Sequence, residues 1–114
     1  MSLPTDSKTR KTIPIFRGFM KLFPDAIAAI AQLTFVATQQ HHPGGEVHWD
    51  KTKSTDEQDA YLRHMLDTCT AGDLAARDTD GVLHAVKQGW RAMANLQRLA
   101  DDGVDIYAVL QQET

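Results

Sequence analysis

Apolar residues recur three and four positions apart in three segments of the chain, which is the spacing of one face of a helix. The first segment follows Pro24 and carries Ile30, Phe35 and many alanines on a broad apolar face. Proline suits the first turn of a helix, because the N–H that it lacks would have no partner there. The pattern ends before the Pro-Gly-Gly run at residue 43. We therefore predict a largely buried helix over residues 24–41.

The second segment opens with two possible reciprocal caps, in which a hydroxyl residue faces an acidic or amide residue three positions later. The two pairs are Ser54 with Glu57 and Thr55 with Gln58. The apolar face that follows consists of Tyr61, Leu62, Met65, Leu66 and Cys69. This pattern predicts a helix over residues 55–71, with Cys69 in the core.

The third segment keeps helical spacing for about five turns. Its apolar positions are Val82, Leu83, Val86, Trp90, Met93, Leu96, Leu99 and Ala100. Asp78 or Thr79 can cap its start, and an Asp-Asp-Gly run closes it, so we predict a helix over residues 79–101. Within this helix, Gly89 lets another helix approach closely, because glycine has no side chain.

No segment alternates polar and apolar residues as a half-buried strand does, so the fold class that we predict is all-α. The expected architecture is a small helical bundle of three main helices plus a short C-terminal helix capped by Asp105. Prolines at positions 4 and 14 predict that residues 1–18 form an extended N-terminal arm. Residues 19–114 then form a single helical domain.

The composition is that of one small, slightly acidic domain of 114 residues and 12.7 kDa. Twelve basic and fifteen acidic residues give a formal charge of −3, which disfavours duplex nucleic acid as a partner. The lone cysteine excludes an intramolecular disulfide, and no apolar run reaches the roughly 20 residues of a membrane span. We expect a cytoplasmic protein without membrane contact. Its broad apolar faces predict a homo-oligomer.

Two histidine–aspartate pairs stand at helical spacing. His64 and Asp67 are three residues apart, and Asp80 and His84 are four apart, so each pair shares one helix face. Imidazole and carboxylate together suit divalent ions, and Mn²⁺ or Zn²⁺ fits such a mixed set better than Mg²⁺. Where the two helices pack together, all four groups can converge on one ion. The alternative is a polar helix edge, in which Arg63 and His64 pair with nearby aspartates.

Other histidines flank the glycine-rich loop. His48 and Trp49 are candidates for substrate binding, because a tryptophan in a polar loop either covers a core edge or stacks on a planar ligand. His41 and His42 are a possible metal pair. Adjacent helical residues point about 100 degrees apart, however, so we interpret these two as a solvated helix end.

Five short motifs follow one another along the chain. They are Leu22-Phe23-Pro24 before the alanine-rich helix, His48-Trp49, Tyr61-Leu62-Arg63-His64-Met65-Leu66, Gly72-Asp73 and Gly81-Val82-Leu83-His84-Ala85. This order resembles the phage-type dATP/dGTP diphosphohydrolase N-terminal domain family. The resemblance covers roughly residues 19–100. Its firmest matches are Trp49, Arg63, His64, Gly81 and His84.

The resemblance implies a phage or prophage enzyme related to the MazG-like, all-α nucleotide pyrophosphohydrolases. Such an enzyme hydrolyses a purine deoxynucleoside triphosphate to the monophosphate and pyrophosphate with divalent ions. The resemblance also implies catalytic roles for Arg63, His64 and His84, with Arg63 neutralising phosphate charge. The metal ligands that we expect are His64, Asp67, Asp80 and His84. The two aspartates rest on spacing rather than on the resemblance.

The chain departs from the family pattern at several positions. His48 stands where the family has asparagine, Asp73 where it has glutamate, and Lys87 where it has a second histidine. The sequence also lacks the Glu-x-x-Glu metal signature of the all-α relatives. Two hypotheses stay open. The chain is a pyrophosphohydrolase, active or degenerate, or it is a small helical oligomeric interaction protein without catalytic activity, whose interface contains Trp90, Met93 and Leu96.

Overall fold

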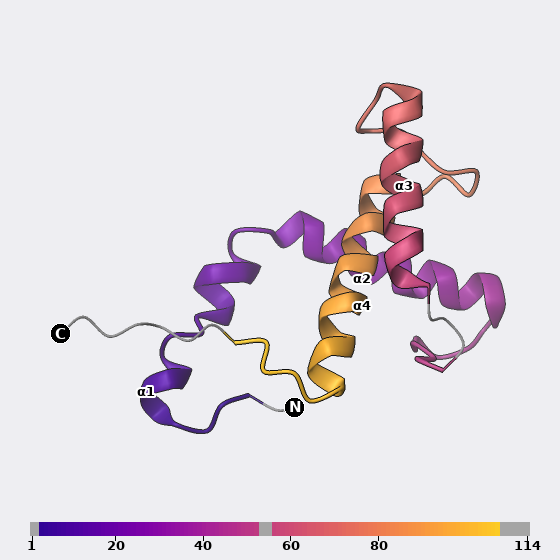
Figure 1. Cartoon of the computed structure of the whole chain (residues 1–114). Helices are drawn as coiled ribbons and strands as arrows, with labels where there is room; N and C mark the ends of the chain where they lie inside the picture. The colour runs from indigo at the N-terminus through magenta and orange to yellow at the C-terminus, as the bar shows by residue number, and fades with distance from the viewer. Residues whose placement is uncertain (1–2, 53–55, 108–114) are drawn as a thin grey trace.

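The computed structural model describes residues 3–52 and 56–107, and all regular elements within them are helical (Figure 1). They are α1 Ser7–Arg10, the π-helical turn η1 Phe16–Met20, α2 Pro24–His41, α3 Glu57–Ala71 and α4 His84–Asp101. The predicted all-α fold with three main helices is confirmed. None of these described helices combines the length and apolarity that crossing a membrane requires.

α3 and α4 lie side by side and antiparallel (Figure 1). Small side chains are buried on both helices, Ala60 on α3 and Ala94 on α4, which permits a short distance between the helix axes. Asn95 Nδ2 donates a hydrogen bond of 2.8 Å to Gln58 Oε1 across the pair. The facing sides of α3 and α4 are therefore held in one register.

α2 crosses α4 at Gly89. A Cβ atom at this position would lie 2.9 Å from Cδ1 of Ile30, so the glycine makes room for the isoleucine side chain. One residue further along α4, Trp90 Nε1 donates a hydrogen bond of 2.9 Å to Thr34 Oγ1 of α2. The close approach expected at Gly89 is confirmed.

α4 starts later than the sequence predicts. It begins at His84 rather than at residue 79, and neither Asp78 nor Thr79 caps it. The two residues belong to a preceding turn, in which Asp78 Oδ1 accepts a hydrogen bond of 2.7 Å from the Thr79 N–H. Gly81 continues this turn with φ 85°, a left-handed conformation that interrupts a helix.

The N-terminal arm also differs from its prediction. Residues 1–18 were expected to be extended, but the described part contains α1 and the start of η1. Asp6 stabilises α1 by accepting a hydrogen bond of 2.9 Å from the Thr9 N–H. After α4, residues 102–107 contain no helix. The rest of the predicted C-terminal helix and the predicted caps Ser54 and Thr55 lie outside the described residues.

The helices bury little of their apolar surface. Thr38 is the one buried residue of α2, and Phe35 is 54% exposed, so the prediction of a largely buried helix is wrong. The physical reason is that α4 covers α2 only around the crossing at Gly89. Cys69, predicted in the core, is exposed on α3.

We expect Gly89→Leu to lower the thermal unfolding temperature by at least about 5 °C, because leucine cannot share the space of the Ile30 side chain. Ala92→Leu is the matched control, since it adds the same side chain at an exposed position of α4. Melting followed by circular dichroism compares the two. Equal unfolding temperatures would contradict the packing of α2 on α4.

Candidate functional site

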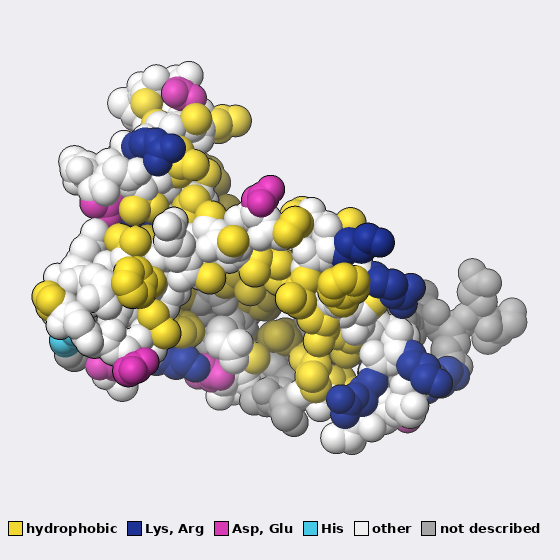
Figure 2. Space-filling view, turned by 180° about the vertical axis from the view of Figure 1, so that it is seen from behind, with side chains coloured by type: hydrophobic (Ala, Val, Ile, Leu, Met, Phe, Trp, Pro, Cys, Tyr) yellow, Lys and Arg dark blue, Asp and Glu magenta, His cyan; other side chains and the backbone are white. Residues whose placement is uncertain are grey.

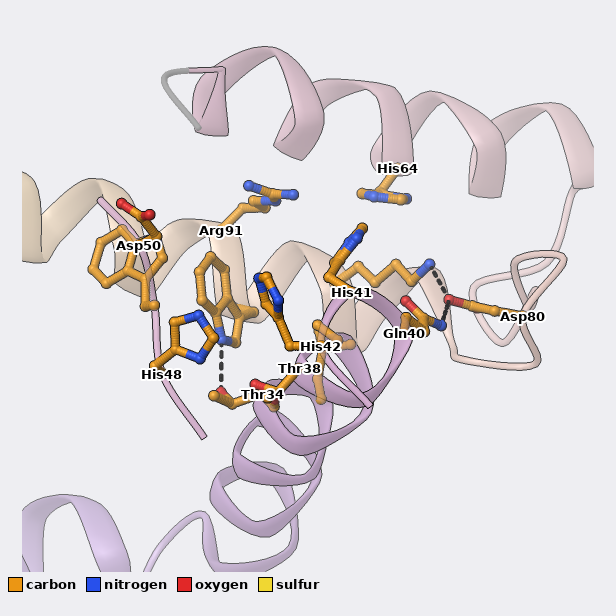
Figure 3. A pocket seen from close by; sticks show the side chains of 15 residues that line it. Thr34, Thr38, Gln40, His41, His42, His48, Asp50, His64, Asp80 and Arg91 are labelled. Carbon is orange, nitrogen blue, oxygen red and sulfur yellow. Dashed lines mark hydrogen bonds and ion pairs between the residues drawn. The ribbon is translucent and has the colours of Figure 1, made fainter. Parts of the chain in front are cut away.

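A cavity of about 720 Å³ lies between the C-terminal half of α2, the loop after it and the α3–α4 pair (Figure 3). Four of the five histidines of the chain line it, namely His41, His42, His48 and His64. A cavity of this size can hold a ligand as large as a nucleotide.

The two ends of the cavity differ in chemistry. His48, Trp49 and Trp90 form what we call the aromatic end. His41, His64 and Lys87 form the polar end. Arg91 lies between the two ends, with its guanidinium group near the side of the cavity where α3 passes (Figure 3).

Three potential metal ligands, which we call the triad, come together at the polar end. Nδ1 of His64 lies 2.9 Å from Nδ1 of His84, and Nδ1 of His84 lies 3.8 Å from Oδ2 of Asp67. One ligand atom from each residue falls within 4.8 Å of the other two. His84 is 6% exposed, whereas the Asp67 carboxylate reaches solvent. The structure thus brings together both histidines and one of the two aspartates that the sequence singled out.

The donor set of the triad fits a divalent ion. The two ring nitrogens are closer to each other than twice an imidazole–metal bond of about 2.1 Å, so one ion can contact both. Burial lowers the pKa of His64, and His84 and the cationic Lys87 lower it further, which keeps the ring neutral as a ligand must be. Two imidazoles and one carboxylate are a set that Zn²⁺ or Mn²⁺ accepts, with room for further ligands.

Asp80 does not belong to the triad, contrary to the spacing argument. Its carboxylate accepts hydrogen bonds from Lys87 Nζ at 2.8 Å and from Gln40 Nε2 at 3.2 Å. The bond from Lys87 lowers the pKa of Asp80 to about 2. Lys87 also binds Asp78 at 2.7 Å, so its ammonium group joins two carboxylates of the turn before α4. Lys87, Asp80 and Gln40, held together by these contacts, form the wall of the cavity at its polar end.

Arg63 lies outside the cavity, although the resemblance implies that it contacts phosphate. Its guanidinium group pairs with Asp56 at 3.1 Å and its side chain is 62% exposed. Neighbouring helical residues point about 100 degrees apart, so the orientation that brings His64 into the cavity turns Arg63 to the surface. Arg91 of α4 supplies the arginine of the cavity instead.

Trp49 packs within the aromatic end. Its ring meets that of Trp90 edge to face, with 5.3 Å between the centroids. Lys51 Nζ and the guanidinium carbon of Arg98 lie 5.1 and 5.2 Å from the Trp49 ring centroid. The indole Nε1 of Trp49 is buried and has no hydrogen-bond partner among the described residues. A buried donor without a partner is uncommon in folded proteins.

A buried carboxylate pairs with two arginines next to the cavity. Glu57 at the start of α3 is 2% exposed, accepts a hydrogen bond of 3.0 Å from Arg98 Nη2 and lies 3.8 Å from Arg91 Nη1. Arg98 Nη2 also donates to the carbonyl oxygen of Lys51 at 3.0 Å. Glu57 thus orients the arginine of the cavity and, through Arg98, the loop that carries Trp49. From its place in the sequence, Glu57 is expected to have only a capping role.

His41 and His42 are cavity residues that the sequence analysis placed at a solvated helix end. α2 ends at His41, and His42 has φ −140° and ψ 75°, so the backbone leaves the helix between the two residues. The helical divergence of adjacent side chains therefore does not apply to them. His42 also lies beside His48, with ring centroids 5.3 Å apart.

No family model, curated protein or solved structure matches the chain. The resemblance to the diphosphohydrolase domain therefore stays a prediction from sequence motifs. The function has to be inferred from the chemistry of the cavity.

We expect Glu57→Gln to destabilise the fold by about 3 kcal/mol, because two partly exposed arginines lose the buried carboxylate that pairs with them. Asp59→Asn is the matched control, since it neutralises an exposed acid on the same helix and should change stability by less than about 0.5 kcal/mol. Urea unfolding at pH 7 measures both. Similar midpoints for the two variants would refute the structural role of Glu57.

We expect the protein to bind one equivalent of Zn²⁺, and His84→Ala to weaken that binding at least about a hundredfold, because one of two nitrogen ligands is lost. His48→Ala removes a cavity histidine outside the triad and should leave the affinity unchanged. Isothermal titration calorimetry gives both values. If His48→Ala abolishes binding and His84→Ala does not, the ion sits elsewhere.

Proposed function

We propose that the protein is a metal-dependent nucleotide pyrophosphohydrolase, which converts a purine deoxynucleoside triphosphate and water to the monophosphate and pyrophosphate. The observation that supports this most is the double role of His64, which belongs both to the triad and to the lining of the cavity. An ion held by His64, Asp67 and His84 would stand at the wall of a cavity that can hold a nucleotide. The preference for a purine rests on the family resemblance.

The chemistry of the cavity suggests how a nucleotide lies in it. The base occupies the aromatic end, where Trp49 and Trp90 offer apolar rings. The triphosphate extends past Arg91 toward His64 at the polar end. This orientation places the negative charge of the ligand beside the cationic and metal-binding groups.

Hydrolysis requires a water oxygen to attack the α-phosphorus while the bond from that phosphorus to the bridging oxygen breaks. Pyrophosphate then leaves with the electron pair of the broken bond. A divalent ion supplies positive charge to the phosphoryl oxygens in this reaction. Arg91 binds the same phosphates through its guanidinium fork. His41, which faces His64 across the cavity (Figure 3), accepts the proton of the attacking water.

The test is to incubate the protein with each of the four deoxynucleoside triphosphates and Mn²⁺ or Mg²⁺, and to follow pyrophosphate release. We expect dATP and dGTP to be hydrolysed fastest. His64→Ala should lower kcat at least about a hundredfold, because it removes a ligand of the ion that acts on the phosphates. Arg91→Met should raise KM about tenfold, because a charged hydrogen bond to phosphate is lost.

Arg63→Met is the matched control for Arg91→Met, since it removes an arginine that lies outside the cavity. Its kinetics should equal those of the wild type. Absence of pyrophosphate release with all four substrates and both ions would refute the enzymatic proposal. Nucleotide binding without hydrolysis, detected by calorimetry, would leave a degenerate binding domain.

The second candidate is a small oligomeric interaction protein without catalytic activity. Met93 and Leu96 favour it, since they are 47% and 46% exposed on one helix. Trp90 does not fit the interface that this hypothesis assigns to it, because its ring packs on Trp49 and its Nε1 binds Thr34 within the chain. A cavity that binds no nucleotide would favour this candidate.

A further inference from the structure

Large apolar side chains lie uncovered on two elements that extend to the same side of α2 (Figure 1). We call them the apolar face. They are Phe16, Phe19 and Met20 of η1 and Met93, Leu96 and Leu99 of α4, each at least 41% exposed. Figure 2, which views the molecule from behind, shows hydrophobic side chains gathered around a hollow. Exposed apolar side chains that gather on one side of a molecule are typical of an interaction surface.

The uncovered part of α4 follows from the packing of the three helices. α3 covers the side of α4 that carries Ala94 and Arg98, and α2 crosses α4 near Gly89. Beyond that crossing, no described element covers Met93 and Leu96. The apolar side of α4 thus extends beyond the part of the helix that α2 covers.

The area of the chain indicates how much surface a partner has to cover. A compact monomer of 12.7 kDa exposes about 6,200 Å², whereas this chain exposes 8731 Å². Its radius of gyration is 16.8 Å, and a compact chain of this length has about 13 Å. The excess of about 2,500 Å², taken over the whole chain, is larger than the roughly 800 Å² that each partner contributes to a standard interface.

Charge on the chain is divided in a way that suits self-association. Residues 7–24, which include η1, contain five basic residues and no acidic one. Because the whole chain carries −3, the remainder carries −8. Two basic segments repel each other, so a dimer that sets each basic segment against another part of the second copy is favoured over one that joins the two segments.

We propose that the apolar face is the interface of a homodimer, in which η1 of each copy packs against the C-terminal half of α4 of the other copy. A twofold arrangement lets each apolar residue of one copy find an apolar surface on the other. The proposal is independent of the catalytic proposal, because none of the six residues lines the cavity.

Size-exclusion chromatography with light scattering tests the proposal on the full chain. At tens of micromolar we expect twice the 12.7 kDa of one chain. Leu96→Glu and Met20→Glu should each weaken dimerisation at least about a hundredfold, because each buries a charge in an apolar interface. Leu74→Glu is the matched control on a loop, where the leucine is 84% exposed, and it should stay dimeric.

The two glutamate variants lie on different elements, so the test still works if one of them fails to fold. Circular dichroism shows whether each variant keeps its helices. A wild-type mass of one chain would overturn the proposal. So would a dimer that both glutamate variants leave intact. A monomer that sediments with phosphatidylserine vesicles would overturn it in favour of a membrane surface for the basic, apolar segment.

Discussion

The packing of α3 on α4 depends on the ion pairs of one buried carboxylate, that of Glu57. Moving an ionised carboxylate out of water costs several kcal/mol, so Glu57 can be buried only where guanidinium groups reach it. Arg91 and Arg98 meet that requirement in a single register of α3 against α4. The same register sets His64 opposite His84. Through Arg98 it also fixes the loop before α3, so the triad and the aromatic end are both consequences of one ion-pair cluster.

The fold was predictable because helical periodicity is a local property of the sequence. α2 matched its predicted bounds, since proline at its start and the Pro-Gly-Gly run after it act on neighbouring residues alone. The start of α4 was missed because Asp78, which looks like a cap, binds Lys87 and the Thr79 N–H instead. Burial was misjudged on α2 because periodicity identifies an apolar face without showing whether the chain itself covers it.

The candidate site was only partly predictable, and the successes and failures have physical reasons. His64 and His84 could be paired because their helices pack in antiparallel order. His42 was dismissed by a helical rule that stops applying where α2 ends. Arg91 and Glu57 left no local signal, because they meet only when α3 and α4 come together from distant parts of the chain.

Lys87 has a consequence for the energetics of ligand binding. Its ammonium group joins Asp78 to Asp80, and Asp80 in turn accepts a hydrogen bond from Gln40 of α2. The turn before α4 and the end of α2 are thus fastened together without any ligand. The side chains in these contacts already have fixed rotamers before a ligand enters the polar end. They therefore lose little conformational entropy when the ligand binds.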